Sequence, residues 1–127
     1  MRQTFREGGF EDLAAYSRAV RIGNHIAVSA TAATGSDGHA LHEGDTYAQT
    51  KLAFERALEG LSALGGSGVD VLRTRMYLDP HAEWRRAVDA HAELFAEVNP
   101  ANSTYFVAGF IPDGVLVEVE LDAVVDP

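Results

Sequence analysis

The segment from Val115 to Val125 alternates between apolar and acidic side chains, and this pattern limits the possible folds more than any other feature of the chain. Successive side chains of an extended strand point to opposite faces of a sheet. The apolar positions are Val117, Val119 and Leu121, and the acidic positions are Glu118, Glu120 and Asp122. The alternation therefore predicts a strand whose apolar face meets a helix-covered core and whose second face is polar.

Two segments carry the apolar period of a helix. Asp45 is a good N-cap, and the apolar stripe that follows it ends at Gly65-Gly66. This stripe consists of Phe54, Ala57, Leu58, Leu61 and Leu64. A second helix is expected from about Glu83 to Val98, before Asn99-Pro100. Its predicted apolar face contains Trp84, Val88, His91 or Ala92, and Phe95.

Three further segments are typical of strands: His25 to Ser29, Val71 to Leu78, and Thr104 to Phe110. In the second of these, one predicted face carries Leu72, Thr74, Met76 and Leu78, and the other carries Val71, Arg73, Arg75 and Tyr77. The order of elements is two or three strands, a helix, a strand, a helix and two strands. It predicts an α+β fold, with a mixed sheet of about five or six strands and two helices on one face.

The second face of this sheet has a mixed composition. It combines the acidic side chains of the last strand with Arg73 and Arg75, which suits a partly polar subunit interface better than a core. Glu118 and Glu120 lie about 7 Å apart on one face of a strand, close enough for an acid and base pair. The alternative, which we favour, is that they pair with Arg73 and Arg75 across the sheet.

The 127 residues suit one domain, from 1 to 127, with enough apolar material for a core. The net charge of −9 argues against nucleic acid as a partner, because nucleic-acid binding depends on neutralising phosphates. No apolar run approaches the roughly 20 residues that span a bilayer, and Met1 to Phe10 lacks a signal-peptide core. We therefore expect a cytoplasmic protein that acts on a small molecule, away from membranes.

Known site motifs are missing from the sequence. The chain has no cysteine, and its five histidines form no H-x-x-x-H or H-E-x-x-H pattern, so we expect no metal site. No glycine-rich phosphate loop is present, and we expect no cofactor. Ser29 ends a predicted strand without a G-x-S-x-G elbow, so a backbone hydrogen bond is its expected role.

Several short motifs together carry a resemblance to a known family. Tyr16 to Val20, Gly23-Asn24 and Val28-Ser29 resemble the opening of the RidA (YjgF) family, which has a tyrosine, a strand, a Gly-Asn turn and a strand ending in Ser-Gly. The later matching segments are Ala48 to Gly65, Val71 to Asp79, the Trp84 helix, and Ile111-Pro112 to Val117–Glu120. The resemblance covers nearly the whole chain in order.

The resemblance implies a chorismate-mutase-like fold, with a six-stranded sheet backed by two helices. It also implies a homotrimer whose sheets form a central barrel, with clefts between subunits. Well-known family members hydrolyse enamines and imines such as 2-aminoacrylate. By the same resemblance, Tyr16 and Ser29 match the cleft tyrosine and serine, and Glu118 matches the glutamate that orients water.

The chain departs from the family at the arginine that clamps the substrate carboxylate. Ser103 is the matching position, and a serine supplies neither the charge nor the guanidinium fork. Ala30 replaces the usual glycine after the cleft serine. The resemblance thus points to an arginine-lacking branch, with Tyr105 and Trp84 making the cleft more apolar and Arg18 or Arg75 as substitute clamps.

Three functions follow as hypotheses. The first is a RidA-like homotrimer that binds a small metabolite in its clefts and hydrolyses or rearranges an enamine- or imine-like compound, with Glu118 orienting water. The second is a 2-aminoacrylate-type deaminase with a relocated anion clamp. The third is a non-catalytic trimer that binds a ligand or a partner.

Overall fold

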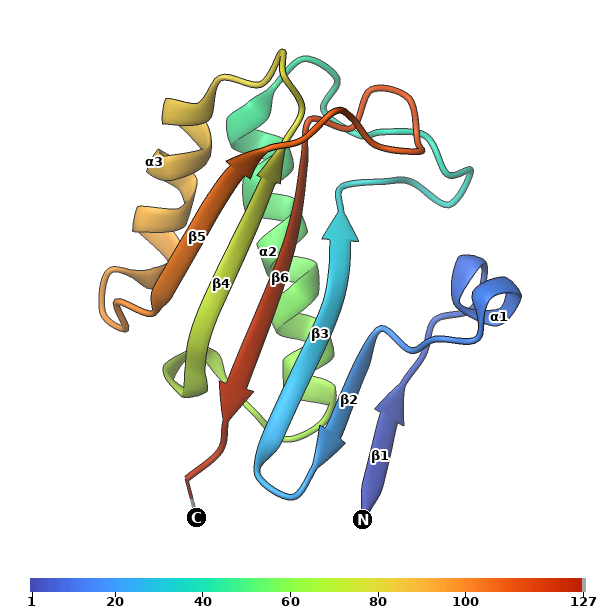
Figure 1. Cartoon of the computed structure of the whole chain (residues 1–127), viewed down its shortest axis with the longest axis vertical. Helices are drawn as coiled ribbons and strands as arrows, with labels where there is room; N and C mark the ends of the chain where they lie inside the picture. Colours follow the sequence, from blue (N-terminus) through green and yellow to red (C-terminus); the bar gives the residue numbers. More distant parts are fainter. Residues whose placement is uncertain (127) are drawn as a thin grey trace.

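The computed structural model describes residues 1–126, which form one six-stranded mixed sheet with helices on one side (Figure 1). The strands are β1 (Arg2–Phe5), β2 (Ala19–Ile22), β3 (His25–Ala32), β4 (Val71–Leu78), β5 (Ala101–Phe106) and β6 (Val117–Val124). The helices are α1 (Phe10–Ala14), α2 (Thr46–Ala63), the 3-10 turn η1 (Gly68–Asp70) and α3 (Trp84–Phe95). The strand order is β1-β2-β3-β6-β4-β5, and only β4 and β5 run parallel.

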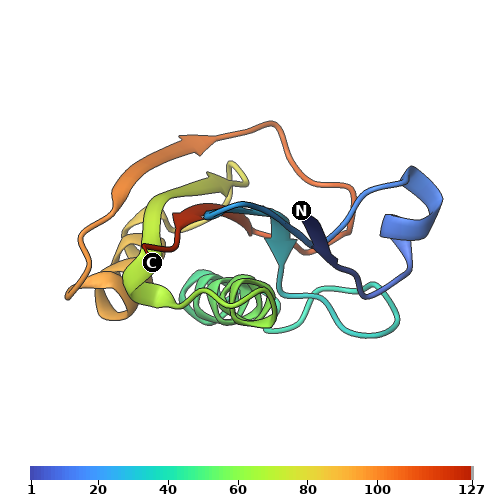
Figure 2. The ribbon, with the colours of Figure 1, turned by 90° about the horizontal axis from the view of Figure 1, so that it is seen from below.

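The helices α2 and α3 cover one face of the sheet and leave the other face free of helices (Figure 2). Val117, Val119 and Leu121 of β6 are fully buried on the covered face, as are Phe54 and Leu61 of α2. Each such side chain contributes about 1.5–3 kcal/mol relative to exposure. The prediction of a mixed sheet backed by two helices is confirmed.

The capping of α2 also follows the sequence. The Asp45 carboxylate accepts a hydrogen bond from the backbone N–H of Ala48 at 3.0 Å, which satisfies one of the free donors of the first turn. The helix then runs to Ala63, and Gly65 follows with a φ of 90°, a conformation that glycine adopts without steric cost.

The predicted faces of β4 are wrong in the first two residues. An irregularity in the pairing with β6 lies between Val71 and Arg73, so Leu72 is 57% exposed and Val71 is buried. A bulge of this kind inserts one residue and inverts the alternation on one side of it. From Arg73 onward the predicted alternation is correct, with Thr74, Met76 and Leu78 buried.

The predicted apolar face of α3 is also partly wrong. Ala87, Ala90 and Phe95 are the buried residues of the helix, whereas Trp84 is 54% exposed and Val88 is 37% exposed. Small alanines face the sheet because they allow the helix to approach it closely. The larger side chains of Trp84 and Val88 instead line a cavity between α3 and β5.

Other boundaries differ near turns. The strand predicted from Thr104 to Phe110 begins at Ala101 and ends at Phe106, and the last strand begins at Val117. The strand β1 and the five-residue helix α1 were not predicted, because Arg2–Phe5 lies at a sheet edge and shows no apolar alternation.

Candidate functional site

The face of the sheet opposite α2 and α3, called here the open face, carries a network of charged side chains. Arg75 of β4 lies 3.0 Å from Asp122 and 3.7 Å from Glu120, both on β6. The Tyr77 hydroxyl donates to a Glu120 carboxylate oxygen at 3.0 Å. The expected pairing across the sheet therefore holds for Arg75 and Glu120, with Asp122 as the closer partner.

Arg73 differs from its neighbour on the same strand. Its Nη1 donates to the Ser103 hydroxyl of β5 at 3.2 Å, and no carboxylate of residues 1–126 lies within ion-pair distance of it. The expected pairing of Arg73 with Glu118 or Glu120 is therefore absent. Ser103 lies on the open face, one strand away from the Arg75 network.

Glu118 occupies a different environment from the other two acidic residues of β6. It pairs in register with Tyr77 on one side and Ala32 on the other, and it is half-buried. Within residues 1–126 it makes no side-chain hydrogen bond or ion pair. Burial raises the pKa of the Glu118 carboxyl, the charge of Arg18 opposes this rise, and the charge of Glu120 adds to it.

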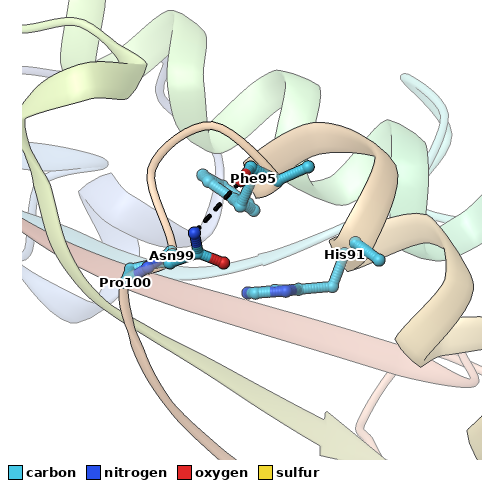
Figure 3. Close-up of a pocket in the computed structure, with 6 residues that line it drawn as sticks. His91, Phe95, Asn99 and Pro100 are labelled. Atoms are coloured by element: carbon cyan, nitrogen blue, oxygen red, sulfur yellow. Dashed lines mark hydrogen bonds between the residues drawn. The ribbon is translucent and has the colours of Figure 1, made fainter.

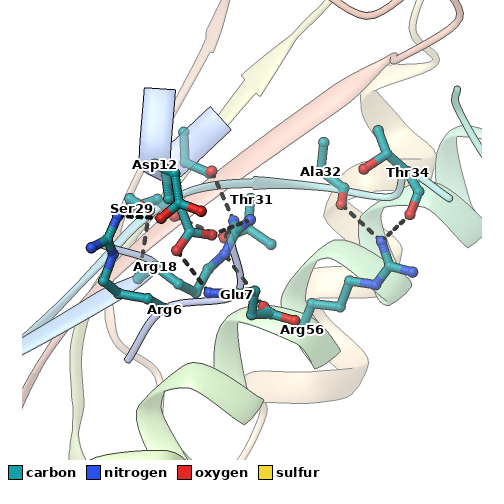
Figure 4. Close-up of polar contacts among 11 residues, drawn as sticks. Arg6, Glu7, Asp12, Arg18, Ser29, Thr31, Ala32, Thr34 and Arg56 are labelled. Carbon is teal, nitrogen blue, oxygen red and sulfur yellow. Dashed lines mark hydrogen bonds and ion pairs between the residues drawn. The ribbon is translucent and has the colours of Figure 1, made fainter. Parts of the chain in front are cut away.

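The antiparallel pairing of β2 with β3 brings Ser29 beside Arg18 (Figure 4). The pairing of β3 with β6 shifts between Val28 and Thr31, and Ser29 lies inside this irregularity. The Ser29 hydroxyl donates to the backbone carbonyl of Arg18 at 3.1 Å, and its N–H donates to the same oxygen at 2.9 Å. The hydroxyl thus donates to the backbone, and within residues 1–126 no side-chain base accepts a hydrogen bond from it.

The Arg18 guanidinium is held in place by oxygen atoms on several sides. Its Nη1 donates to Thr31 Oγ1 at 3.0 Å and to the Ala30 carbonyl at 3.2 Å. Its other nitrogens lie 3.6 Å from Glu7 and 3.5 Å from Glu11, and Glu11 is only 2% exposed. Arg18 therefore neutralises a buried carboxylate.

Tyr16 lies in the segment between α1 and β2. Its backbone N–H donates to the carbonyl of Glu11 at 3.0 Å, and the residue is 39% exposed. In the same region Arg56 donates to the carbonyls of Ala32 and Thr34, which fastens the end of β3 to α2 (Figure 4). Within residues 1–126 Tyr16 and Ser29 make no hydrogen bond to each other, and their segments are linked through Glu11 and Arg18.

A cavity of about 380 Å³ lies on the other side of the sheet, between α3 and the edge strand β5. It is lined by Leu78, Trp84, Val88, Asn102, Thr104, Tyr105 and Phe106. Trp84 and Tyr105, two of the residues predicted for ligand binding, both line this cavity. Ser103 is not part of this lining, because alternation along β5 places Asn102 and Thr104 there.

Asn102 and Thr104 are polar cavity residues that were not among the predicted site residues. The Thr104 hydroxyl donates to Asn102 Oδ1 at 2.8 Å, and Asn102 Nδ2 donates to the Thr74 hydroxyl at 3.0 Å. The available signal was the alternation within Ala101–Phe106, which places residues 102 and 104 on the same face as the buried Thr74 and Met76.

A second cavity of about 340 Å³ lies between the end of α3 and the start of β5 (Figure 3). His91, Phe95, Asn99 and Pro100 line it together with two alanines. The Thr74 hydroxyl contacts His91 Nε2 at 2.7 Å, and burial lowers the pKa of the His91 imidazole. His91 is therefore neutral near pH 7 and is used in packing against the rings of Phe54 and Phe95.

The predicted site residues form three groups. Glu118 and Arg18 are near enough to interact electrostatically, and Ser29 is bonded to the Arg18 backbone. Arg75 lies in the ion-pair network of the open face. Trp84 and Tyr105 line the same cavity, together with the polar residues Asn102 and Thr104 on the helix side of the sheet.

In residues 1–126 no three potential metal ligands come together, and no helix there is long and apolar enough to cross a membrane.

The sheet, its two covering helices and the bulged β3 strand define an α+β fold class that recurs among solved structures. A crystal structure of a Mycobacterium tuberculosis member of the YjgF/YER057c/UK114 family matches with a TM-score of 0.87 and 36% identity. The match covers 98% of this chain and 100% of that chain.

The family assignment rests on the sequence as well. The family described as Endoribonuclease L-PSP matches residues 9–125, and the chain belongs to this family, the RidA (YjgF) family. An uncharacterized protein of Streptomyces coelicolor is 38% identical over 115 residues, which cover 90% of this chain and 84% of that protein. A RutC family protein of Pyrococcus abyssi is 28% identical over 116 residues, 91% of each chain.

Proposed function

We propose that the chain forms a homotrimer that binds a small metabolite in clefts between subunits and hydrolyses an enamine or imine there. The observation that carries this proposal is Glu118. It is a half-buried carboxyl with a raised pKa, it lacks a hydrogen-bond partner in residues 1–126, and it lies on a sheet face with no helix over it. Such a group is suited to hold a water molecule and take its proton.

The separation of the candidate residues supports a site shared between subunits. Glu118 projects from the open face, whereas Trp84 and Asn102 lie toward the helix side of the sheet. One chain therefore cannot bring both groups to one small ligand. If the open face of one subunit contacts the β5 edge of the next, Glu118 of one subunit meets the Trp84 cavity of its neighbour.

The proposed reaction needs only one general base. Glu118 removes a proton from water while the oxygen adds to the electrophilic carbon of the C=N bond, and it passes that proton to the nitrogen to give the neutral carbinolamine. Glu118 then takes the proton of the new hydroxyl and delivers it to the nitrogen, so the C–N bond breaks, ammonia leaves and the carbon becomes a ketone. The raised pKa of Glu118 brings its proton affinity closer to what this exchange requires near neutral pH.

The two arginines considered as substitute anion clamps already have partners. Arg75 is paired with Asp122 and Glu120, and Arg18 with Glu7 and Glu11. If either arginine moved to bind a ligand, a half-buried or buried carboxylate would lose its counter-charge. This favours a ligand other than a simple amino-acid derivative over a 2-aminoacrylate deaminase with a relocated clamp.

The family's descriptive name refers to an endoribonuclease, and we do not extend that activity to this chain. Its net charge is −9, and the open face carries three acidic residues on β6 against the two arginines of β4. An RNA backbone gains little from such a surface, because affinity for nucleic acid depends on phosphate neutralisation.

The test compares imine hydrolysis by the wild type and Glu118→Gln. Enamines and imines are generated in place, from 2-aminoacrylate to imines with apolar side chains, and ammonia release is followed. We expect turnover of at least one compound by the wild type and a loss of about a hundredfold or more in Glu118→Gln. Equal rates in both proteins, or no turnover of any compound, contradict the hydrolase and leave a binding trimer.

A gain-of-function pair tests the clamp position. Asn102→Arg places a guanidinium in the cavity, and Ser103→Arg is the matched control whose side chain starts on the open face. We expect only Asn102→Arg to raise activity on 2-aminoacrylate. A gain in Ser103→Arg alone contradicts the cavity as the ligand site.

A further inference from the structure

The cavity between α3 and β5 is walled mainly by apolar and aromatic groups. Trp84 and Phe106 are each more than half exposed at its rim, Val88 and Leu78 form the remaining apolar wall, and Tyr105 borders it from the strand face that it shares with Ser103. Large aromatic side chains left open in this way are costly unless a ligand or a neighbouring subunit covers them.

The polar wall of the cavity is oriented by a chain of hydrogen bonds. The Thr104 hydroxyl donates to Asn102 Oδ1, so Asn102 Nδ2 faces Thr74 and donates to its hydroxyl. The Thr74 hydrogen is then free to be donated to His91 Nε2 at 2.7 Å, which a neutral imidazole accepts. The hydrogen bonds from Thr104 and to Thr74 thereby orient the Asn102 amide.

This arrangement leaves a defined set of polar atoms for a ligand. One Asn102 N–H is left with only a long contact of 3.4 Å to the Thr74 carbonyl, and the Thr104 oxygen retains free lone pairs. The wall therefore offers one neutral donor and one neutral acceptor. An amide or a carbonyl group matches this pair, and each is satisfied without a charge.

The cavity contains no charged side chain among its lining residues. A carboxylate placed there loses hydration and gains no cation, which is costly in a partly apolar site. The net charge of −9 adds a repulsive field to this cost. Anionic ligands are therefore discriminated against by the same residues that accept neutral ones.

We infer that this cavity selects neutral ligands that carry an aryl or branched alkyl group next to a carbonyl or amide, and that it rejects free carboxylates. The inference rests on the proposed function, for which it names the ligand class: the imine substrate is a neutral derivative, such as an amide, in place of a free amino-acid imine. The apolar group lies against Trp84 and Phe106, and the carbonyl or amide lies against Asn102 and Thr104.

The test uses the single tryptophan of the chain as a reporter. Trp84 lines the cavity, so ligand binding is followed by its fluorescence. The probes are hydrocinnamamide and hydrocinnamate, which have the same size and differ in charge, and propanamide, which lacks the ring. We expect hydrocinnamamide to bind about tenfold or more tighter than either of the others. Equal or tighter binding of hydrocinnamate, or no response to any probe, overturns the inference.

Substitutions in the cavity test which residues cause the preference for the neutral ligand over the anionic one. Asn102→Arg should reverse the preference toward hydrocinnamate, and Asn102→Ala should weaken hydrocinnamamide by several-fold. Ser103→Ala is the matched control on the same strand and should leave both affinities unchanged. An unchanged preference in Asn102→Arg contradicts the assigned site.

The inferred ligand class and the proposed function can be refuted independently of each other. Trimer mass and the Glu118→Gln effect on imine turnover are measured without these probes, so a trimeric hydrolase that prefers hydrocinnamate refutes only the ligand class. A monomer, or turnover that is insensitive to Glu118→Gln, refutes the proposed function itself.

Discussion

The two faces of strand β6 show how one alternating sequence serves two different environments. Val117, Val119 and Leu121 are fully buried under α2 and α3. Glu118, Glu120 and Asp122, which alternate with them, are only half-buried on the open face, and two of the three are bound to Arg75 or Tyr77.

This difference indicates that the open face is arranged for something other than the stability of the isolated chain. A plain solvent face has no need of a half-buried carboxyl that lacks a partner, and Glu118 is one. The covered face supplies the folding free energy, which leaves the open face free to hold charges that an assembly or a ligand completes.

The largest expected effect is a difference in the free energy of unfolding between substitutions on the two faces of β6. Leu121→Ala removes a fully buried side chain and should lower the free energy of unfolding by about 2–5 kcal/mol. Asp122→Asn, its neighbour on the open face, breaks a partly exposed ion pair and should cost about 1 kcal/mol or less. Urea denaturation followed by circular dichroism measures both, and equal losses would remove the distinction between the faces.

A second change separates stability from function on the open face. Glu118→Gln should abolish imine hydrolysis while leaving the fold intact. Because the folded-state pKa of Glu118 is raised, the carboxyl favours folding most below its unfolded pKa, and this contribution is lost as pH rises through the folded pKa. The variant should therefore be slightly more stable than the wild type at neutral pH, and a marked loss of melting temperature there would contradict this.

A smaller effect is expected from the ion-pair network. Arg75→Met leaves Glu120 and Asp122 without their shared cation and should cost about 1 kcal/mol at neutral pH, since the group is partly exposed and screened. The cost should shrink at high salt, because mobile ions screen the attraction between Arg75 and the two carboxylates. A loss that is independent of salt would mean that the side chain acts by packing alone.

The smallest effect lies on the covered face and concerns His91. Burial lowers its pKa, so the folded chain binds fewer protons there than the unfolded chain. The contribution of neutral His91 is present above about pH 6.5 and is lost as pH falls through the lowered folded pKa. His91→Gln should flatten the stability profile in that range. An unchanged slope of the profile in His91→Gln would contradict this assignment.

The elements with strong periodicity could be predicted from the sequence. The α2 stripe and the β6 alternation each repeat over many residues, so tertiary packing has little room to change their assignment. Arg2–Phe5 could not be predicted because four residues at a sheet edge need no apolar alternation. The bulge that exposes Leu72 depends on pairing with β6, a long-range contact that local sequence does not contain.

The site was predicted less completely than the fold. The acidic β6 residues and their pairing with Arg75 follow from alternation alone, and Glu118 was named from the family resemblance. Which polar residues face the cavity depends on the start of β5 at Ala101, three residues earlier than predicted. That shift in boundary is why Asn102 was missed, whereas Thr104 was already inside the predicted strand. It also explains why Ser103 lies beside Arg73 on the open face.

The assembly is the most direct test of the account, because a cleft made by Glu118 of one subunit and the Trp84 cavity of another requires it. Light scattering on the purified chain measures the mass without any ligand. We predict a mass of three chains, three times 13.6 kDa, at the concentrations used for activity. A mass of 13.6 kDa under those conditions would contradict the shared cleft and leave the open face without its proposed role.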